Sequence, residues 1–186
     1  MHNQSILQTK RLLLRQWTDE DFLPFAKMCA DKDVMEFFPK VLTESESNDI
    51  AKEIKSLISN RGWGFWAVEI PNHERFIGFV GLHTPDNLPF SPCVEIGWRL
   101  SKTHWRKGYA TEAASKCLKY AFTVLNLKEV VSFTTVANNR SQAVMQKIGM
   151  SNTGCNFMHP EVAASHPQCE HVLYKIQKQD WTKSTL

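Results

Sequence analysis

A carboxylate and an anion-binding turn lie close together on one short stretch of this chain. Glu95 opens the apolar run Glu95–Leu100, and Gly108 follows a basic turn that contains Arg106 and Lys107. The run predicts a strand, and the residues after Gly108 predict a helix. The first amides of a helix have no intrahelical partner, so they bind phosphate or pyrophosphate groups. We therefore expect a phosphate-bearing ligand whose reactive end lies near Glu95.

Composition places the chain among ordinary globular proteins. Of its 186 residues, 42% are hydrophobic and 22% are charged, which is typical of a soluble domain. The net charge of +3 is too small to indicate a nucleic-acid partner. The one dense basic cluster lies on the phosphate turn, which explains it more simply; its members are Arg99, Lys102, Arg106 and Lys107. We expect no nucleic-acid partner.

The apolar runs and the cysteines predict a compartment. No apolar run approaches the roughly 20 residues that a membrane span needs, and residues 1–10 do not have the pattern of a signal peptide. The five cysteines are an odd number and include no CxxC pair, so free thiols are expected. These features favour a cytoplasmic protein with no membrane partner.

Hydrophobic periodicity predicts the elements that position the site. Thr43 and Glu46 form a capping box before a helix, and Gly62 follows its end. The apolar positions of residues 108–125 follow helical spacing without a miss. Further helices are expected from residue 18 to about 29 and over residues 138–148. Strands are expected at residues 11–17, 65–70, 76–82, 94–100, 129–137, 151–157 and 171–176.

The order of these elements predicts a fold class. A hairpin is followed by alternating strands and helices, which implies an α/β (α+β) chain with a mixed sheet and helices on both faces. A ligand is expected where two neighbouring strands part. No segment resembles a linker rich in glycine or serine, so residues 1–186 are expected to form a single domain.

Three motif blocks then resemble a known family. Residues 105–110, Trp-Arg-Lys-Gly-Tyr-Ala, resemble the acetyl-CoA signature of the GNAT superfamily of N-acetyltransferases, Gln/Arg-x-x-Gly-x-Gly/Ala, with Trp105 at the first position. The neighbouring blocks resemble the branch of the ribosomal-protein N-terminal acetyltransferases RimJ and RimL. They are Glu-Ile-Gly-Trp at 95–98, Gly-Tyr-Ala-Thr-Glu-Ala at 108–113, and Asn138 and Ser141 with Lys147, Gly149 and Met150. The resemblance covers roughly residues 8–177.

The resemblance implies a fold and a co-substrate. The fold would be the acyl-CoA N-acyltransferase fold, with a mixed, mostly antiparallel sheet of about seven strands that is splayed in the middle. Acetyl-CoA would lie in the splay, its pyrophosphate on backbone amides of residues 106–111 and its pantetheine arm against the strand edge at residues 98–100. Asn138 and Ser141 would lie beside the thioester. The implied acetyl-CoA-binding residues are Trp98, Arg99, Leu100, Trp105, Arg106, Lys107, Gly108, Tyr109, Ala110, Thr111, Asn138 and Ser141.

Acyl transfer to an amine requires a group that removes a proton, because an ammonium has no lone pair. Glu95 is the candidate general base, directly or through water, and the alternative is that its carboxylate only hydrogen-bonds a neighbouring loop. A backbone amide near Trp98 would stabilise the developing oxyanion. The family's usual tyrosine acid is replaced by Met145, so Ser141 or a water would protonate the thiolate, unless Ser141 only caps its helix.

Alternatives to this mechanism are weaker but remain open. Cys93 lies near Glu95, but no histidine is placed to activate it, so direct transfer in a ternary complex is expected over an acyl-enzyme. The histidines and cysteine of residues 159–171 fit no standard ligand spacing, so no metal is expected and this loop would border the acceptor pocket.

The leading hypothesis is transfer of an acetyl group from acetyl-CoA to a primary amine. The amine would belong to a protein N-terminus or a small molecule. The alternative is a non-catalytic acyl-CoA-binding or sensor domain on the same fold. The sequence leaves the acceptor unnamed, and it is compatible with either a monomer or a homodimer.

Overall fold

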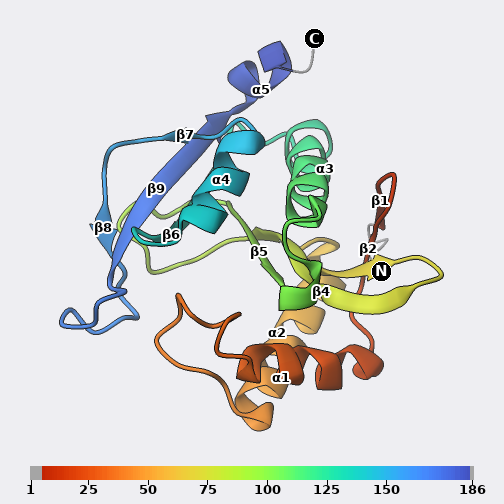
Figure 1. The fold of residues 1–186 in the computed structure, drawn as a ribbon. Helices are drawn as coiled ribbons and strands as arrows, with labels where there is room; N and C mark the ends of the chain where they lie inside the picture. Colours follow the sequence, from red (N-terminus) through yellow and green to blue (C-terminus); the bar gives the residue numbers. More distant parts are fainter. Residues whose placement is uncertain (1–5, 185–186) are drawn as a thin grey trace.

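The computed structural model describes residues 6–184, which fold around one nine-stranded sheet (Figure 1). The sheet order is β1-β2-β3-β4-β5-β6-β9-β7, and β8 pairs with β9 outside this path. Only the β5–β6 pair is parallel among these pairings. The strands are β1 Leu7–Gln8, β2 Leu13–Arg15, β3 Phe65–Ile70, β4 Glu74–His83, β5 Glu95–Leu100, β6 Glu129–Thr135, β7 Ser151–Asn152, β8 Phe157–Met158 and β9 Glu170–Gln177.

This architecture confirms the expected mixed, mostly antiparallel sheet. Its strand count exceeds the expected number of about seven because three of the nine strands have only two residues. The prediction of one strand over residues 151–157 is wrong. Gly154, at φ 72°, lies between β7 and β8, so two short strands reach β9 separately. At the other end, the strand expected over residues 11–17 is limited to Leu13–Arg15.

The helices are α1 Phe22–Ala30, α2 Glu44–Arg61, α3 Tyr109–Thr123, α4 Asn139–Lys147 and α5 Lys178–Ser184. The capping box of α2 forms as predicted. The Glu46 amide donates to Thr43 Oγ1 at 3.2 Å, and the Thr43 amide donates to Glu46 Oε2 at 2.8 Å. Gly62 then ends the helix with a φ of 83°, a left-handed conformation that glycine adopts without strain. No helix was expected at α5, because its residues carry no apolar repeat.

Helices cover both faces of the sheet (Figure 1). On one face α1 and α2 pack together, and Phe25 of α1 contacts Phe79 of β4 with ring centroids 6.0 Å apart. On the other face α3 lies against β4 and β5, and Tyr120 packs edge-on against Trp66 of β3 at 5.5 Å. Both faces of the sheet are therefore covered by helices. The ends of the strands remain uncovered, and the candidate site lies there.

The sheet splays between its two central strands. β4 and β5 pair over six residues, whereas β5 and β6 share the single register pair Glu95 and Val131. The Val131 amide donates to Val94 O at 2.9 Å, and one residue later Ser132 Oγ donates to Ile96 O at 2.8 Å. Beyond this point no pairing joins β5 to β6 in the part of the chain that the structure describes. The parting of two neighbouring strands, expected from the sequence, is confirmed.

Two sequence expectations concern the whole chain. All five cysteines are free thiols, as expected. Within residues 6–184 no helix is both long enough and apolar enough to cross a membrane. The expectation about a signal peptide at residues 1–10 falls partly on residues 1–5, which lie outside the described residues.

Candidate active site

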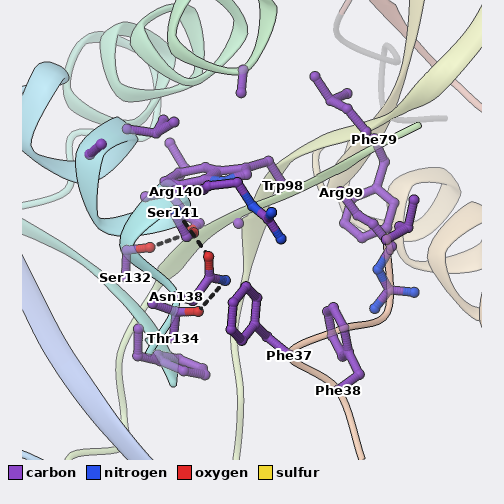
Figure 2. Close-up of a pocket in the computed structure, with 18 of the residues that line it drawn as sticks. Phe37, Phe38, Phe79, Trp98, Arg99, Ser132, Thr134, Asn138, Arg140 and Ser141 are labelled. Atoms are coloured by element: carbon purple, nitrogen blue, oxygen red, sulfur yellow. Dashed lines mark hydrogen bonds between the residues drawn. The ribbon is translucent and has the colours of Figure 1, made fainter. Parts of the chain in front are cut away.

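A cavity of about 720 Å³ opens where β5 and β6 part (Figure 2). Its walls come from both strands, from the starts of α3 and α4, and from two loops, residues 34–39 and residues 159–171. Twelve of the thirteen residues singled out from the sequence line it: Glu95, Trp98, Arg99, Leu100, Trp105, Arg106, Gly108, Tyr109, Ala110, Thr111, Asn138 and Ser141. Lys107 does not, and its carbonyl instead accepts a hydrogen bond from Arg11 Nη1 at 3.0 Å.

The turn before α3 has the geometry of an anion cradle. Arg106 and Gly108 both take left-handed conformations, with φ of 61° and 81°, and α3 begins directly after them. The first amides of α3 therefore lack intrahelical partners at one end of the cavity. Arg11 fixes the turn from outside, because its guanidinium lies 4.6 Å from the Tyr109 ring centroid and its Nε donates to Glu112 at 2.6 Å. These features fit a pyrophosphate.

The free edge of β5 fits an amide-bearing arm. Ile96 O accepts from Ser132, and Leu100 O accepts from Trp105 Nε1 at 2.8 Å, so both carbonyls point away from β4. Backbone groups alternate in direction along a strand, so the amide and carbonyl of Trp98 point the same way, into the splay. The residue expected to bind pantetheine thus presents both a donor and an acceptor to the cavity.

Glu95 lies at the closed end of the splay, where β5 still pairs with β6, and its side chain lines the cavity. Burial, and next the negative charge of Glu161, raise the pKa of Glu95 to about 7. Among the described residues its carboxylate has no hydrogen-bond partner, so the alternative role of hydrogen-bonding a loop is not observed. A partly buried carboxylate of this kind is half-protonated near neutral pH and can both accept and release a proton.

An aromatic wall faces Glu95 from the far side of the splay. Phe133 of β6 contacts His159 and His171, with ring centroids 5.8 Å and 6.1 Å away, and the two imidazoles are 5.0 Å apart. Burial lowers the pKa of both histidines, which favours their neutral form. The loop of residues 159–171 therefore borders the cavity, as expected, and it presents two neutral imidazoles together with the carboxylate of Glu161. Phe133 was missed, because strand periodicity alone does not show which face opens on a cavity.

The start of α4 separates two roles that the sequence left open. Asn138, not Ser141, caps the helix: its Oδ1 accepts from the Ser141 amide at 3.1 Å, and its Nδ2 donates to Thr134 Oγ1 at 2.9 Å (Figure 2). The Ser141 hydroxyl lines the cavity and has no hydrogen-bond partner within the described residues. Met145 is only 1% exposed and belongs to the core, so it supplies nothing to the cavity.

A covalent role for Cys93 is disfavoured. Cys93 lies outside this cavity and lines a smaller pocket of about 340 Å³ behind β5. Burial raises the pKa of its thiol, which opposes formation of the nucleophilic thiolate. As for metals, residues 6–184 contain no group of three or more His, Cys, Asp or Glu side chains arranged to hold an ion.

The remaining wall combines phenylalanines with two arginines. Phe37 and Phe38 project from the loop after α1 toward the cavity (Figure 2). The Arg140 guanidinium lies 4.6 Å from the Trp105 ring centroid and forms an ion pair with Glu36. Arg99 lies 4.2 Å from the Phe38 ring centroid. These contacts join segments that are far apart along the chain, 104 residues for Arg140 and Glu36, which is why sequence patterns did not indicate them.

Comparisons with known proteins agree with this geometry. Residues 11–151 match the family model described as an acetyltransferase (GNAT) domain. An uncharacterized N-acetyltransferase of Bacillus subtilis, YnaD, is 28% identical, with 94% of this chain and 98% of YnaD covered. The FsC-acetyl coenzyme A-N(2)-transacetylase of Aspergillus fumigatus is 29% identical, with 97% and 79% covered. An acetyltransferase (GNAT family) crystal structure from Bacillus anthracis superposes with a TM-score of 0.78 at 25% identity, covering 94% of this chain and 99% of that one.

Proposed function

The chain belongs to the GNAT family of acetyltransferases, and from that premise we propose that it transfers an acetyl group from acetyl-CoA directly to a primary amine, with Glu95 as proton acceptor. The single observation that carries this assignment is the Glu95 carboxylate. It lies on the cavity at the splay, lacks a hydrogen-bond partner among the described residues, and has a pKa of about 7. A base whose pKa lies near the working pH is unprotonated in a large fraction of molecules and is still basic enough to accept a proton.

Acetyl-CoA fits the residues present. The amides at the start of α3 would hold its pyrophosphate, helped by the positive end of the helix dipole. The backbone of Trp98 would pair with the pantetheine arm as an added strand does. Acetyl-CoA supplies the acetyl group as a thioester. The Trp98 amide would donate to the thioester carbonyl oxygen, on which negative charge develops, while the Trp98 carbonyl would accept from the pantetheine arm.

The protein's own groups would then move two protons. An amine enters as its ammonium, and Glu95 removes the proton, directly or through water, to expose the lone pair. Because His159 and His171 would be neutral, they would not repel that ammonium as it enters. The Ser141 hydroxyl would relay the second proton: it would protonate the departing thiolate and take up the proton that the nitrogen loses as the amide forms, replacing the acid that Met145 cannot provide. Its position on the cavity and its lack of a partner in the described chain support this role.

The finer assignments are also proposals. We infer that the whole chain is one domain and that it belongs to the RimJ/RimL-like branch, because the three motif blocks occur in order and all border the cavity. The acceptor would be a protein N-terminus or a small-molecule amine.

A panel of amines tests the proposal. The purified protein is mixed with acetyl-CoA and each amine in turn, and free thiol release is followed. Amine-dependent release that falls at least about 100-fold in Glu95→Gln supports catalysis by this site. Binding of acetyl-CoA without release for any amine class would instead favour the sensor domain. Glu129→Gln is the matched control, because Glu129 is also on a central strand but lies outside the cavity and pairs with Lys175.

A further inference from the structure

Arg99 occupies the same face of β5 as Glu95. Side chains of a strand alternate, so residues 95, 97 and 99 point to one side, and the middle one is Gly97. Both charged side chains line the cavity, and the Phe65 ring lies over Gly97, 3.2 Å from where a Cβ would be, so it forms the floor between them. Figure 2 shows the Arg99 guanidinium beside Phe38, on the wall opposite Asn138 and Ser141.

The Arg99 guanidinium has no anionic partner within the described residues. Its Nη1 contacts Cys29 Sγ at 3.2 Å, and its planar group lies 4.2 Å from the Phe38 ring centroid. Its Nε is buried and makes no hydrogen bond. Burial lowers the pKa of Arg99, but an arginine remains charged at neutral pH. A buried charge without an opposite charge is costly, so its retention on a cavity wall indicates a partner from outside.

Other arginines of the chain show what is missing. Arg15 is paired with both Asp21 and Glu69, each at 2.7 Å. Arg140, on the same cavity, is paired with Glu36. The fold supplies carboxylates to these guanidinium groups, and it supplies none to Arg99 in the described part of the chain.

We propose that Arg99 binds a carboxylate of the acceptor, so that the acceptor is an amine that also carries a carboxylate. This inference rests on the proposed function, because Glu95 marks the position of the amine. At about 3.3 Å per residue, the α-carbons of Glu95 and Arg99 are about 13 Å apart, and their side chains share the space above Gly97. That separation favours an amine and a carboxylate several bonds apart, as in a short peptide or an ω-amino acid, over a free α-amino acid.

A polyamine fits the same wall poorly. Its second ammonium would meet Arg99, and the contact between like charges in a partly desolvated site is unfavourable. A carboxylate would accept two parallel hydrogen bonds from the guanidinium fork, with Phe37 and Phe38 excluding water from one side. The aliphatic part of the acceptor would cross Gly97 and Phe65.

Matched pairs of acceptors test the proposal. The pairs are ω-amino acids of increasing chain length and their primary amides, which differ only in the terminal charge. With acetyl-CoA, the parent is expected to show kcat/KM values about 10- to 100-fold higher for the carboxylates, the range expected for hydrogen bonds to a charged group. Arg99→Gln should bring the ratio of the two kcat/KM values, carboxylate over amide, close to one, because KM for the carboxylates rises. Arg99→Lys should keep part of it.

Controls separate Arg99 from other cationic groups. Arg140→Gln, which removes an already paired arginine from the same cavity, should leave the carboxylate-to-amide ratio unchanged. The affinity for acetyl-CoA should also be unchanged in Arg99→Gln, as measured by calorimetry. A large loss of that affinity, with the acceptor ratio retained, would mean that Arg99 binds a CoA phosphate and would overturn the proposal.

A binding measurement keeps this test independent of turnover. Calorimetry of the CoA-bound protein with N-acetylated ω-amino acids and their amides is expected to show the same preference for carboxylates, lost in Arg99→Gln. If no amine is acetylated but this preference appears, the catalytic proposal fails and the anion subsite stands. Equal binding of acids and amides, or tighter binding of N-acetylated diamines, refutes the subsite.

Discussion

Glu95→Gln should raise stability while it lowers activity. The substitution keeps the size of the side chain and removes its ability to ionise. In the folded protein the pKa of Glu95 is about 7, compared with an ordinary value of 4.5. The folded state thus holds this proton more tightly than the unfolded state does, and ionising the carboxylate works against folding.

The magnitude and its pH dependence follow from that difference. Below about pH 4.5 the group is protonated in both states and contributes nothing to the free energy of unfolding. Stability then falls as the pH rises from about 4.5 to about 7, and the full cost is present above pH 7. The difference in pKa corresponds to at most about 3 kcal/mol, and we expect about 1–3 kcal/mol because the side chain is partly solvent-exposed.

Urea unfolding at pH 4 and pH 8.5 measures this directly. The free energy of unfolding of Glu95→Gln should match the parent at pH 4 and exceed it by about 1–3 kcal/mol at pH 8.5. In the same preparation kcat/KM should fall by about 100-fold or more. A variant no more stable than the parent at either pH would falsify the raised pKa of Glu95. Undiminished turnover in the variant would show that Glu95 is not the base.

Three further outcomes are expected. In the parent, kcat/KM should rise about tenfold per pH unit below pH 7 and level off above it. Glu161→Gln should move the inflection of this profile to lower pH, because the charge of Glu161 helps to raise the pKa of Glu95. A pH–rate profile that does not move in this variant would contradict that coupling. Gly108→Val should abolish acetyl-CoA binding in calorimetry and lower the thermal unfolding midpoint, because Gly108 has a φ of 81° that a β-branched residue resists. Gly97→Ala should raise the KM for the acceptor more than the KM for acetyl-CoA. The added methyl lies 3.2 Å from the Phe65 ring and would displace it from the cavity floor between Glu95 and Arg99. Equal changes in the two KM values would argue against acceptor binding over this floor.

Local signals in the sequence were sufficient for the elements that carry their own boundaries. The capping box at Thr43 and Glu46 and the glycine at 62 determine α2, and the repeat after Gly108 determines α3. The parting of β5 from β6 also followed, because one motif block lies on β5 and another begins shortly after β6. Short strands such as β7 and β8 did not follow, since a two-residue strand is formed by its partner β9 rather than by its own pattern.

The same distinction applies to the site. The residues of the phosphate turn and the carboxylate were found because they are consecutive or nearly so. Of the wall that faces the acceptor, the loop of residues 159–171 was expected. The contacts of Phe38 with Arg99, and of Phe133 with His159 and His171, were not, because they join distant parts of the chain. Arg99 itself was selected only as part of a strand edge and of a basic cluster. Its missing counter-ion is a property of the surrounding packing, which no local pattern encodes.

The contacts of Arg11 tie the donor-binding turn to the first strands of the sheet. Arg11 donates to the carbonyl of Lys107 and to Glu112, about 100 residues away along the chain, and Thr9 Oγ1 donates to Glu112 at 2.6 Å. The turn that would hold the pyrophosphate is therefore braced by a segment at one edge of the sheet, and such a segment can open locally without global unfolding. Thermodynamic linkage then runs both ways. Fraying of residues 7–15 weakens the affinity for the donor, and bound donor slows amide hydrogen exchange in those residues.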